Sequence, residues 1–250
     1  MDFRGKVAVV TGGGTGLGRE ISRLFVERGA GLAIIYSRSR EEAEKTAREL
    51  ARDGQSVTTH QIDVADEARV VSGFDQIARQ HGGIDFLVNN AGTTRHAPFS
   101  DLEALTGEVW DEILGVNVKG AFFCARAAAP HMRARGGGAI VNVTSTAGLR
   151  PQGSSLAYSV SKAALNHLTR GLAVGLGPDV RVNSVAPGGM YTRWWSGRRT
   201  REQWDAAIGD RPLRRYAALE DIALAAIQLI ENPSATGQIL VMDGGQIMPG

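Results

Sequence analysis

The 250-residue sequence lacks several features that mark particular classes of protein. Its one cysteine, Cys124, excludes an internal disulfide and fits a reducing compartment. Cys124 lies in an apolar helical stretch, where a buried packing residue is expected rather than a reactive thiol. No run approaches the ~18 apolar residues of a membrane span, and the N-terminus lacks the apolar core of a signal peptide. These absences predict a cytoplasmic protein with no membrane partner.

Neither sign of charge dominates the chain. The 28 Lys and Arg residues against 26 Asp and Glu residues give a net charge of +2, which argues against nucleic acid as a partner. The five histidines are scattered without ligand spacing, so no metal site is expected. Hydrophobic residues make up 43% of the chain, enough for the core of one domain spanning residues 1–250.

Strand-like and helix-like segments alternate along the chain, which predicts an α/β protein with a parallel sheet covered by helices on both faces. Strands are expected at Val7–Val10, Gly31–Tyr36, Ser56–Ile62, Ile84–Val88, Ala139–Thr144, Val180–Ala186 and Gln238–Val241. Helices are expected at Glu41–Ala51, Ala68–Gln80, Trp110–Arg133, Ala157–Leu176 and Glu220–Ile230. A dinucleotide would then bind at the carboxyl ends of the strands, where the strand order reverses.

A glycine-rich turn, Thr11–Gly18, follows the first apolar run and precedes a helix whose apolar residues share one face. Glycines in this strand–turn–helix context let the backbone approach a pyrophosphate, which the helix N-terminus then stabilises. The spacing G-x-x-x-G-x-G differs from the commoner G-x-G-x-x-G. A tight turn that binds nothing remains the alternative.

A second motif, Tyr158-x-x-x-Lys162, places a phenol and an ammonium group on one face of a helix. A nearby ammonium favours the phenolate and is expected to lower the pKa of Tyr158 from roughly 10. A tyrosine tuned in this way exchanges protons with a carbonyl or alcohol oxygen, and Ser145 could hydrogen-bond the same oxygen. The spacing alone also fits an ordinary pair of residues on a helix surface.

Together these motifs resemble the short-chain dehydrogenase/reductase family, over nearly the whole chain. The family's T-G-x-x-x-G-x-G matches Thr11–Gly18, its N-N-A-G matches Asn89–Gly92, and its P-G matches Pro187-Gly188. The resemblance implies a single-domain Rossmann fold with seven parallel strands in the order 3-2-1-4-5-6-7. The family's catalytic set matches Asn117, Ser145, Tyr158 and Lys162.

The resemblance also implies a homotetramer and a set of roles in cofactor binding. Asp63 and the Val64 amide would contact adenine, although Asp63 could instead cap the next helix, for which Asp66 is better placed. Asn89 is expected to pin neighbouring strands together. The predicted cofactor site consists of Gly12, Gly14, Thr15, Gly16, Leu17, Gly18, Ser37, Arg38, Asp63, Val64, Asn90, Ala91, Gly92, Tyr158, Lys162, Pro187, Gly188 and Thr192.

The end of the second strand indicates the choice of cofactor. NAD enzymes of this architecture carry an acid there, whereas this chain has Tyr36 followed by Ser37 and Arg38. A guanidinium binds phosphate bidentately, so NADP(H) is favoured and NAD(H) remains possible. Thr15 occupies the position in the glycine-rich turn where many NADP-preferring relatives carry a basic residue.

The segment at about 188–213 is long and rich in tryptophan and arginine, and the resemblance implies a lid over the substrate. The resemblance is strongest to the branch of 3-oxoacyl-[acyl-carrier-protein] reductases, which act on small-molecule carbonyls. Sugar and secondary-alcohol dehydrogenases using NAD(P) are the alternative. A catalytically silent dinucleotide-binding scaffold is the alternative of another class.

Overall fold

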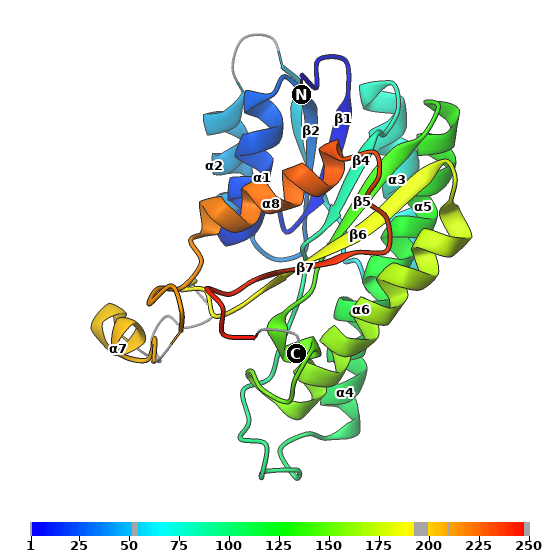
Figure 1. Cartoon of the computed structure of the whole chain (residues 1–250). Helices are drawn as coiled ribbons and strands as arrows, with labels where there is room; N and C mark the ends of the chain where they lie inside the picture. Colours follow the sequence, from blue (N-terminus) through cyan, green and yellow to red (C-terminus); the bar gives the residue numbers. More distant parts are fainter. Residues whose placement is uncertain (1, 52–54, 193–199, 210, 248–250) are drawn as a thin grey trace.

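The structure, a computed structural model, describes residues 2–51, 55–192, 200–209 and 211–247. Strands alternate with helices along the chain (Figure 1). The strands are β1 (Val7–Thr11), β2 (Gly31–Tyr36), β3 (Val57–Gln61), β4 (Phe86–Asn89), β5 (Gly138–Val143), β6 (Val180–Pro187) and β7 (Ile239–Met242). The helices are α1 (Gly16–Glu27), α2 (Arg40–Leu50), α3 (Glu67–His81), α4 (Gly107–Leu114), α5 (Ala121–Ala134), α6 (Leu156–Leu176), α7 (Arg201–Ala206) and α8 (Leu219–Glu231), with short turns η1 (Gly115–Gly120) and η2 (Thr146–Gly148).

The strands form one parallel sheet in the order β3-β2-β1-β4-β5-β6-β7, which confirms the predicted fold. The order reverses at β1, which pairs with β2 on one side and with β4 on the other. Open α/β sheets bind ligands in the crevice where the strand order reverses. In this sheet that place lies at the carboxyl ends of β1 and β4.

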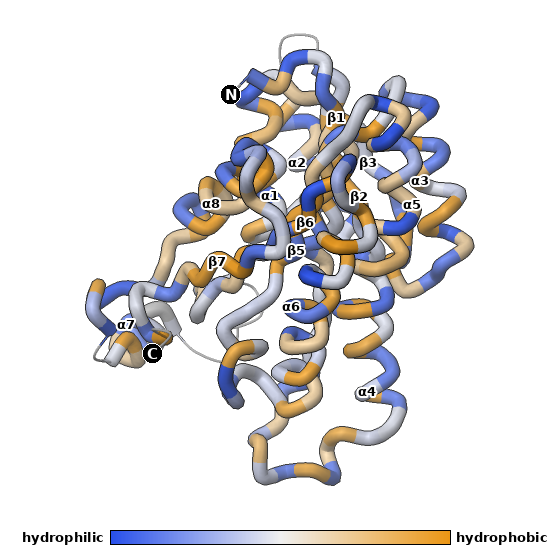
Figure 2. The backbone as a smooth tube through the Cα atoms, turned by 45° about the vertical axis from the view of Figure 1, so that its right-hand side comes forward, coloured by the Kyte–Doolittle hydropathy of each residue, from blue (hydrophilic) through white to orange (hydrophobic). Residues whose placement is uncertain are grey.

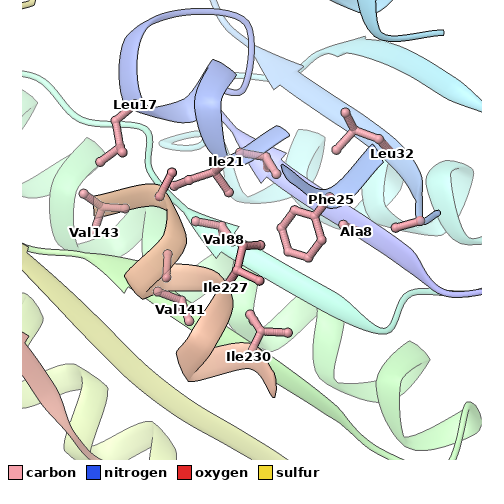
Figure 3. Packing of buried hydrophobic residues seen from close by; sticks show 14 of the residues in the cluster. Ala8, Leu17, Ile21, Phe25, Leu32, Val88, Val141, Val143, Ile227 and Ile230 are labelled. Atoms are coloured by element: carbon pink, nitrogen blue, oxygen red, sulfur yellow. The ribbon is translucent and has the colours of Figure 1, made fainter. Parts of the chain in front are cut away.

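Two apolar layers hold the helices on opposite faces of the sheet. Helices α1, α2 and α8 pack on one face, where Phe25 and Ile227 are fully buried against Val88 and Val141 (Figure 3). Helices α3, α5 and α6 pack on the other face. Burying a large apolar side chain stabilises the fold by about 1.5–3 kcal/mol. The helices alternate between hydrophilic and hydrophobic residues along their length, as expected for elements with one face toward the sheet (Figure 2).

The segment predicted as a helix over Trp110–Arg133 is helical throughout, but its middle is not an α-helix. A π-helical turn, Gly115–Gly120, separates α4 from α5. Gly120 lies so close to Val64 that an added Cβ would come within 2.7 Å of the Val64 side chain. Such wide turns are often found at functional sites, and this one carries Asn117.

Predicted strand ends differ from the observed ends by at most two residues. The largest shift is at β4, predicted as Ile84–Val88 and observed as Phe86–Asn89. Among the described residues, no helix combines the length and apolar character needed to cross a membrane.

Candidate active site

A cavity of about 730 Å³ lies at the carboxyl ends of the central strands, at the reversal of strand order. It brings together most residues of the predicted cofactor site. Those that line it are Gly12, Thr15, Gly16, Leu17, Ser37, Arg38, Asp63, Val64, Asn90, Ala91, Gly92, Tyr158, Lys162 and Thr192. Gly14, Gly18, Pro187 and Gly188 do not line it.

The glycines of the Thr11–Gly18 turn have two different tasks. Gly12 and Gly16 line the cavity with φ values of 65° and 52°, a backbone conformation that favours glycine. A Cβ on Gly14 would lie 2.6 Å from the Cα of Ala43, so Gly14 allows α2 to approach the turn. Gly18 is similarly close to the Gly12 carbonyl and allows α1 to pack against the turn.

Polar side chains from β1 and β4 fix the shape of this turn. The Thr11 hydroxyl oxygen accepts hydrogen bonds from the backbone N–H groups of Asn90 and Ala91, at 3.0 and 2.9 Å. The Asn90 side chain donates to the Thr11 carbonyl at 2.9 Å. Asn89 points elsewhere and donates to Asn142 on β5 at 2.9 Å, which confirms its predicted role between strands.

Tyr158 and Ser145 come from different elements and meet beside the cavity, which Tyr158 lines and Ser145 does not. Ser145 follows β5 at the start of the η2 turn, and Tyr158 lies in the first turn of α6, after the cap residue Ser155. A hydrogen bond joins the side chains of Ser145 and Tyr158. Burial raises the pKa of Tyr158 to about 12, while the hydrogen bond from Ser145 acts in the opposite direction.

The predicted downward shift of the Tyr158 pKa is therefore wrong for this structure. Lys162 lies with its nitrogen 5.7 Å from the centroid of the Tyr158 ring, and it donates to the Val143 carbonyl at 2.8 Å. Burial lowers the pKa of Lys162 to about 8, because its charged form loses hydration. Desolvation thus outweighs the attraction between ammonium and phenolate on which the prediction depended.

Asn117 is 1% exposed and forms hydrogen bonds with two other segments. Its side chain accepts from the Thr93 backbone N–H at 2.8 Å and donates to the Thr93 carbonyl at 3.0 Å. It also donates to the Ser161 hydroxyl at 3.0 Å. These bonds leave the Asn117 side chain fully engaged and tie the π-helical turn to the loop after β4 and to α6.

One end of the cavity is formed by the end of β2 and the start of α2. Tyr36, Ser37, Arg38, Ser39 and Glu42 line it there. The first backbone bond of α2 runs from the Ala43 N–H to the Ser39 carbonyl, and Ser39 makes no side-chain cap. This helix start can therefore accept an anion beside Arg38.

Of the two aspartates that follow β3, Asp66 is the helix cap, as predicted. Asp66 caps α3 by accepting from the Arg69 N–H at 3.1 Å, whereas Asp63 lines the cavity. Gly188, which follows β6, was predicted to line the cofactor site but does not line the cavity. It packs against Asp243, and its N–H donates to the Met242 carbonyl.

Part of the predicted lid lies within the described residues. Helix α7 starts with a capping box between Thr200 and Gln203, and Trp204 is buried against Tyr216, with ring centroids 4.7 Å apart. Trp204 thus contacts Tyr191 within the segment and Tyr216 just beyond it. Trp194 and Trp195, two of the tryptophans of this segment, lie outside the described residues.

Sequence reasoning missed several cavity residues. Ile35, Tyr36, Ile62, Val143 and Thr144 stand at or next to strand ends, a signal that could have identified them. Glu42, Thr93, Glu112, Val116 and Met190 also line the cavity, and no motif marks them. Across the described ranges, no group of three or more His, Cys, Asp or Glu residues could hold a metal ion.

A comparison with known protein families shows to which family the chain belongs. The model of the short chain dehydrogenase family matches residues 6–203. The chain belongs to the short-chain dehydrogenase/reductase family. As a member it is an NAD(P)-dependent oxidoreductase.

Named relatives within the family differ in what they act on. A granaticin polyketide synthase protein of Streptomyces violaceoruber, named as ketoacyl reductase 2, is 42% identical over 96% of this chain and 95% of its own length. The D-threitol dehydrogenase of Mycolicibacterium smegmatis is 36% identical over 98% of this chain and 95% of its own. A short-chain dehydrogenase of Burkholderia cenocepacia in complex with NADP has a TM-score of 0.88 and 33% identity, covering 98% and 99% of the two chains.

Proposed function

We propose that this protein interconverts a ketone and a secondary alcohol with NADP(H), and that its substrate is a 3-oxoacyl thioester or a related carbonyl compound. The observation that carries the proposal is the hydrogen bond from Ser145 to Tyr158, a residue that lines the cavity beside Lys162. A hydroxyl pair of this kind can hold a carbonyl oxygen and supply it with a proton.

The residues of the cavity fit the dinucleotide. Gly12 and Gly16 line the cavity, and among the described residues a Cβ on Gly16 would meet only Thr192, at 3.9 Å. Helix α1 begins at Gly16, and its N-terminus would stabilise the pyrophosphate. Asn90, Ala91 and Gly92 would line the adenosine ribose, Asp63 and Val64 the adenine, and Thr192 the nicotinamide side.

When bound, the nicotinamide supplies the hydride that the protein itself cannot provide. Tyr158 would donate a proton to the carbonyl oxygen in reduction and take it back in oxidation. A pKa of about 12 keeps Tyr158 protonated at neutral pH, which suits it as an acid. Ser145 would orient the substrate oxygen by a second hydrogen bond.

Lys162 and Asn117 would support this proton transfer. Lys162 is placed to hold positive charge near the Tyr158 ring and to bind the nicotinamide ribose hydroxyls. Asn117 would act through the π-helical turn and a water molecule, connecting Lys162 to a proton relay. Its side-chain bonds to Thr93 and Ser161 fix the backbone of that turn.

Two named relatives bear on the class of substrate. The 42% identical relative named as a ketoacyl reductase favours a 3-oxoacyl thioester. The relative named D-threitol dehydrogenase favours the second candidate, a polyol or another secondary alcohol. Fold and catalytic residues are common to both activities, so they do not separate them.

A panel of ketones and alcohols, assayed with NADPH and NADP⁺ at the nicotinamide absorbance, tests this proposal. Reduction of 3-oxoacyl thioesters with higher kcat/KM than any sugar or polyol oxidation supports it. A preference for polyols would favour the second candidate. Cofactor binding without turnover of any compound would indicate a dinucleotide-binding scaffold and overturn the proposal. A cytoplasmic location and a homotetrameric assembly are part of the same proposal.

A further inference from the structure

Two opposite charges line the same end of the cavity. Arg38 follows β2, and Glu42 stands four residues later in the first turn of α2. The resemblance to known enzymes supplied a role for Arg38 but none for Glu42. Glu42 is nevertheless one of the residues that line the cavity there, with Ser37, Arg38 and Ser39.

Glu42 differs in this respect from its neighbour Glu41. Both carboxylates lie in the first turn of α2, both are exposed, and both complement the positive end of the helix. Only Glu42 lines the cavity. The shared role at the helix start therefore does not account for the position of Glu42, and Glu41 provides a matched control.

We propose that the Glu42 carboxylate is a specificity determinant that opposes the 2′-phosphate of NADP(H). This inference rests on the proposed NADP(H) chemistry. A phosphate monoester carries a charge of about −1.5 to −2 at neutral pH. Arg38 and the backbone N–H groups at the start of α2 attract it, while the negative charge of Glu42, at the same end of the cavity, repels it. Because Glu42 opposes Arg38, the preference for NADP(H) is smaller than Arg38 alone would give. NAD(H) has a 2′-hydroxyl in place of the phosphate, so it is still bound.

Equilibrium binding of NADP⁺ and NAD⁺ to the full chain, measured by calorimetry, tests this inference without relying on turnover. The variants are Glu42→Gln and Glu41→Gln, which each remove one charge with little change of shape. We expect Glu42→Gln to tighten NADP⁺ binding by about threefold to tenfold and to change NAD⁺ binding by less than about twofold. Glu41→Gln should change both affinities by less than about twofold, and the gain in Glu42→Gln should shrink in ~0.5 M salt.

Several outcomes would overturn the inference. Equal gains in both variants would show an effect of net charge alone, and equal gains for both cofactors would show that the 2′-phosphate is not involved. Weaker NADP⁺ binding in Glu42→Gln would show that the carboxylate supports Arg38 instead. A wild-type protein that prefers NAD⁺ would contradict the proposed NADP(H) preference and leave this inference standing, because Glu42→Gln must still favour NADP⁺ selectively.

Discussion

The side-chain nitrogen of Lys162 donates a hydrogen bond to the carbonyl oxygen of Val143 at 2.8 Å. This bond joins α6 to the end of β5 and holds a buried ammonium group at the wall of the cavity. Because a single carbonyl replaces much of the water around the charge, burial lowers the pKa of Lys162 to about 8. Lys162 is then the group whose charge changes within the working pH range.

A pH–rate profile tests this assignment. We expect kcat/KM for ketone reduction to fall above an apparent pKa near 8, because Lys162 is charged below that value and neutral above it. Tyr158, with a pKa of about 12, stays protonated over the same range and adds no step of its own. In Lys162→Met the step near 8 should disappear and kcat/KM should drop about a hundredfold. A step that persists in Lys162→Met would assign it to another group.

The preference between cofactors is expected to depend on Arg38. Removing one charged contact to a phosphate costs about 1.5–3 kcal/mol, or about ten- to a hundredfold in affinity. Arg38→Ala should therefore raise the KM for NADPH by that factor and leave the KM for NADH nearly unchanged. Arg40→Ala is a suitable control, since Arg40 donates to Gln61 at 2.9 Å and does not line the cavity. Equal weakening of both cofactors in Arg38→Ala would contradict the assignment.

Two histidines at the edge of the sheet predict how stability depends on pH. The Thr58 hydroxyl lies 2.8 Å from the Nε2 atoms of both His60 and His81. Burial lowers the pKa of each histidine below the ordinary value of 6.5, and in His60 the nearby His81 adds to the effect. Both histidines therefore bind protons more readily in the unfolded chain than in the folded one. Their contribution to the free energy of unfolding is complete above about pH 6.5 and is lost as the pH falls below that value.

Urea unfolding at pH 7.5 and pH 5.5 checks this expectation. The loss of unfolding free energy between the two pH values should be smaller in His81→Gln than in the wild type. His167→Gln, on α6 and away from this pair, serves as the control and should match the wild type. If His81→Gln loses as much stability as the wild type, the pair does not titrate as described.

The assembly can be tested by light scattering. The sequence resemblance implies a homotetramer, and exposed apolar side chains such as Phe122 and Val160, on α5 and α6, offer surfaces for contact. A closed tetramer at micromolar concentration is the expected result, with D₂ symmetry as its natural form. A monomer of 26.6 kDa at that concentration would contradict the prediction.

The sequence predicted the sheet well and the site less completely. Apolar runs that alternate with helical segments located the seven strands. The resemblance to the family supplied the order of the strands in the sheet. The π-helical turn escaped prediction because the apolar pattern runs through Gly115–Gly120 without a break, and one wider turn leaves no signal in it. Gly14 and Gly18 have the spacing of a phosphate-binding motif, yet close packing of α2 and α1 requires glycine at those positions for another reason.

The orientation of Lys162 shows a further limit of sequence reasoning. The spacing Tyr158-x-x-x-Lys162 correctly places both residues on one helical face, and the structure lines the cavity with both. The spacing does not indicate how deeply the two side chains are buried. Burial reverses the expected shift of the Tyr158 pKa, and only the packing of α6 against β6 and η2 reveals it.

The most direct test of the central claim is kcat/KM of Tyr158→Phe with NADPH and the best ketone substrate, beside the Kd of NADPH. The substitution removes the hydroxyl that bonds to Ser145 and leaves the ring in place. Loss of a general acid should lower kcat/KM by about 10²–10⁴ while the Kd stays within about twofold of the wild type. Near-full turnover by Tyr158→Phe, with NADPH bound as in the wild type, would contradict Tyr158 as the proton donor.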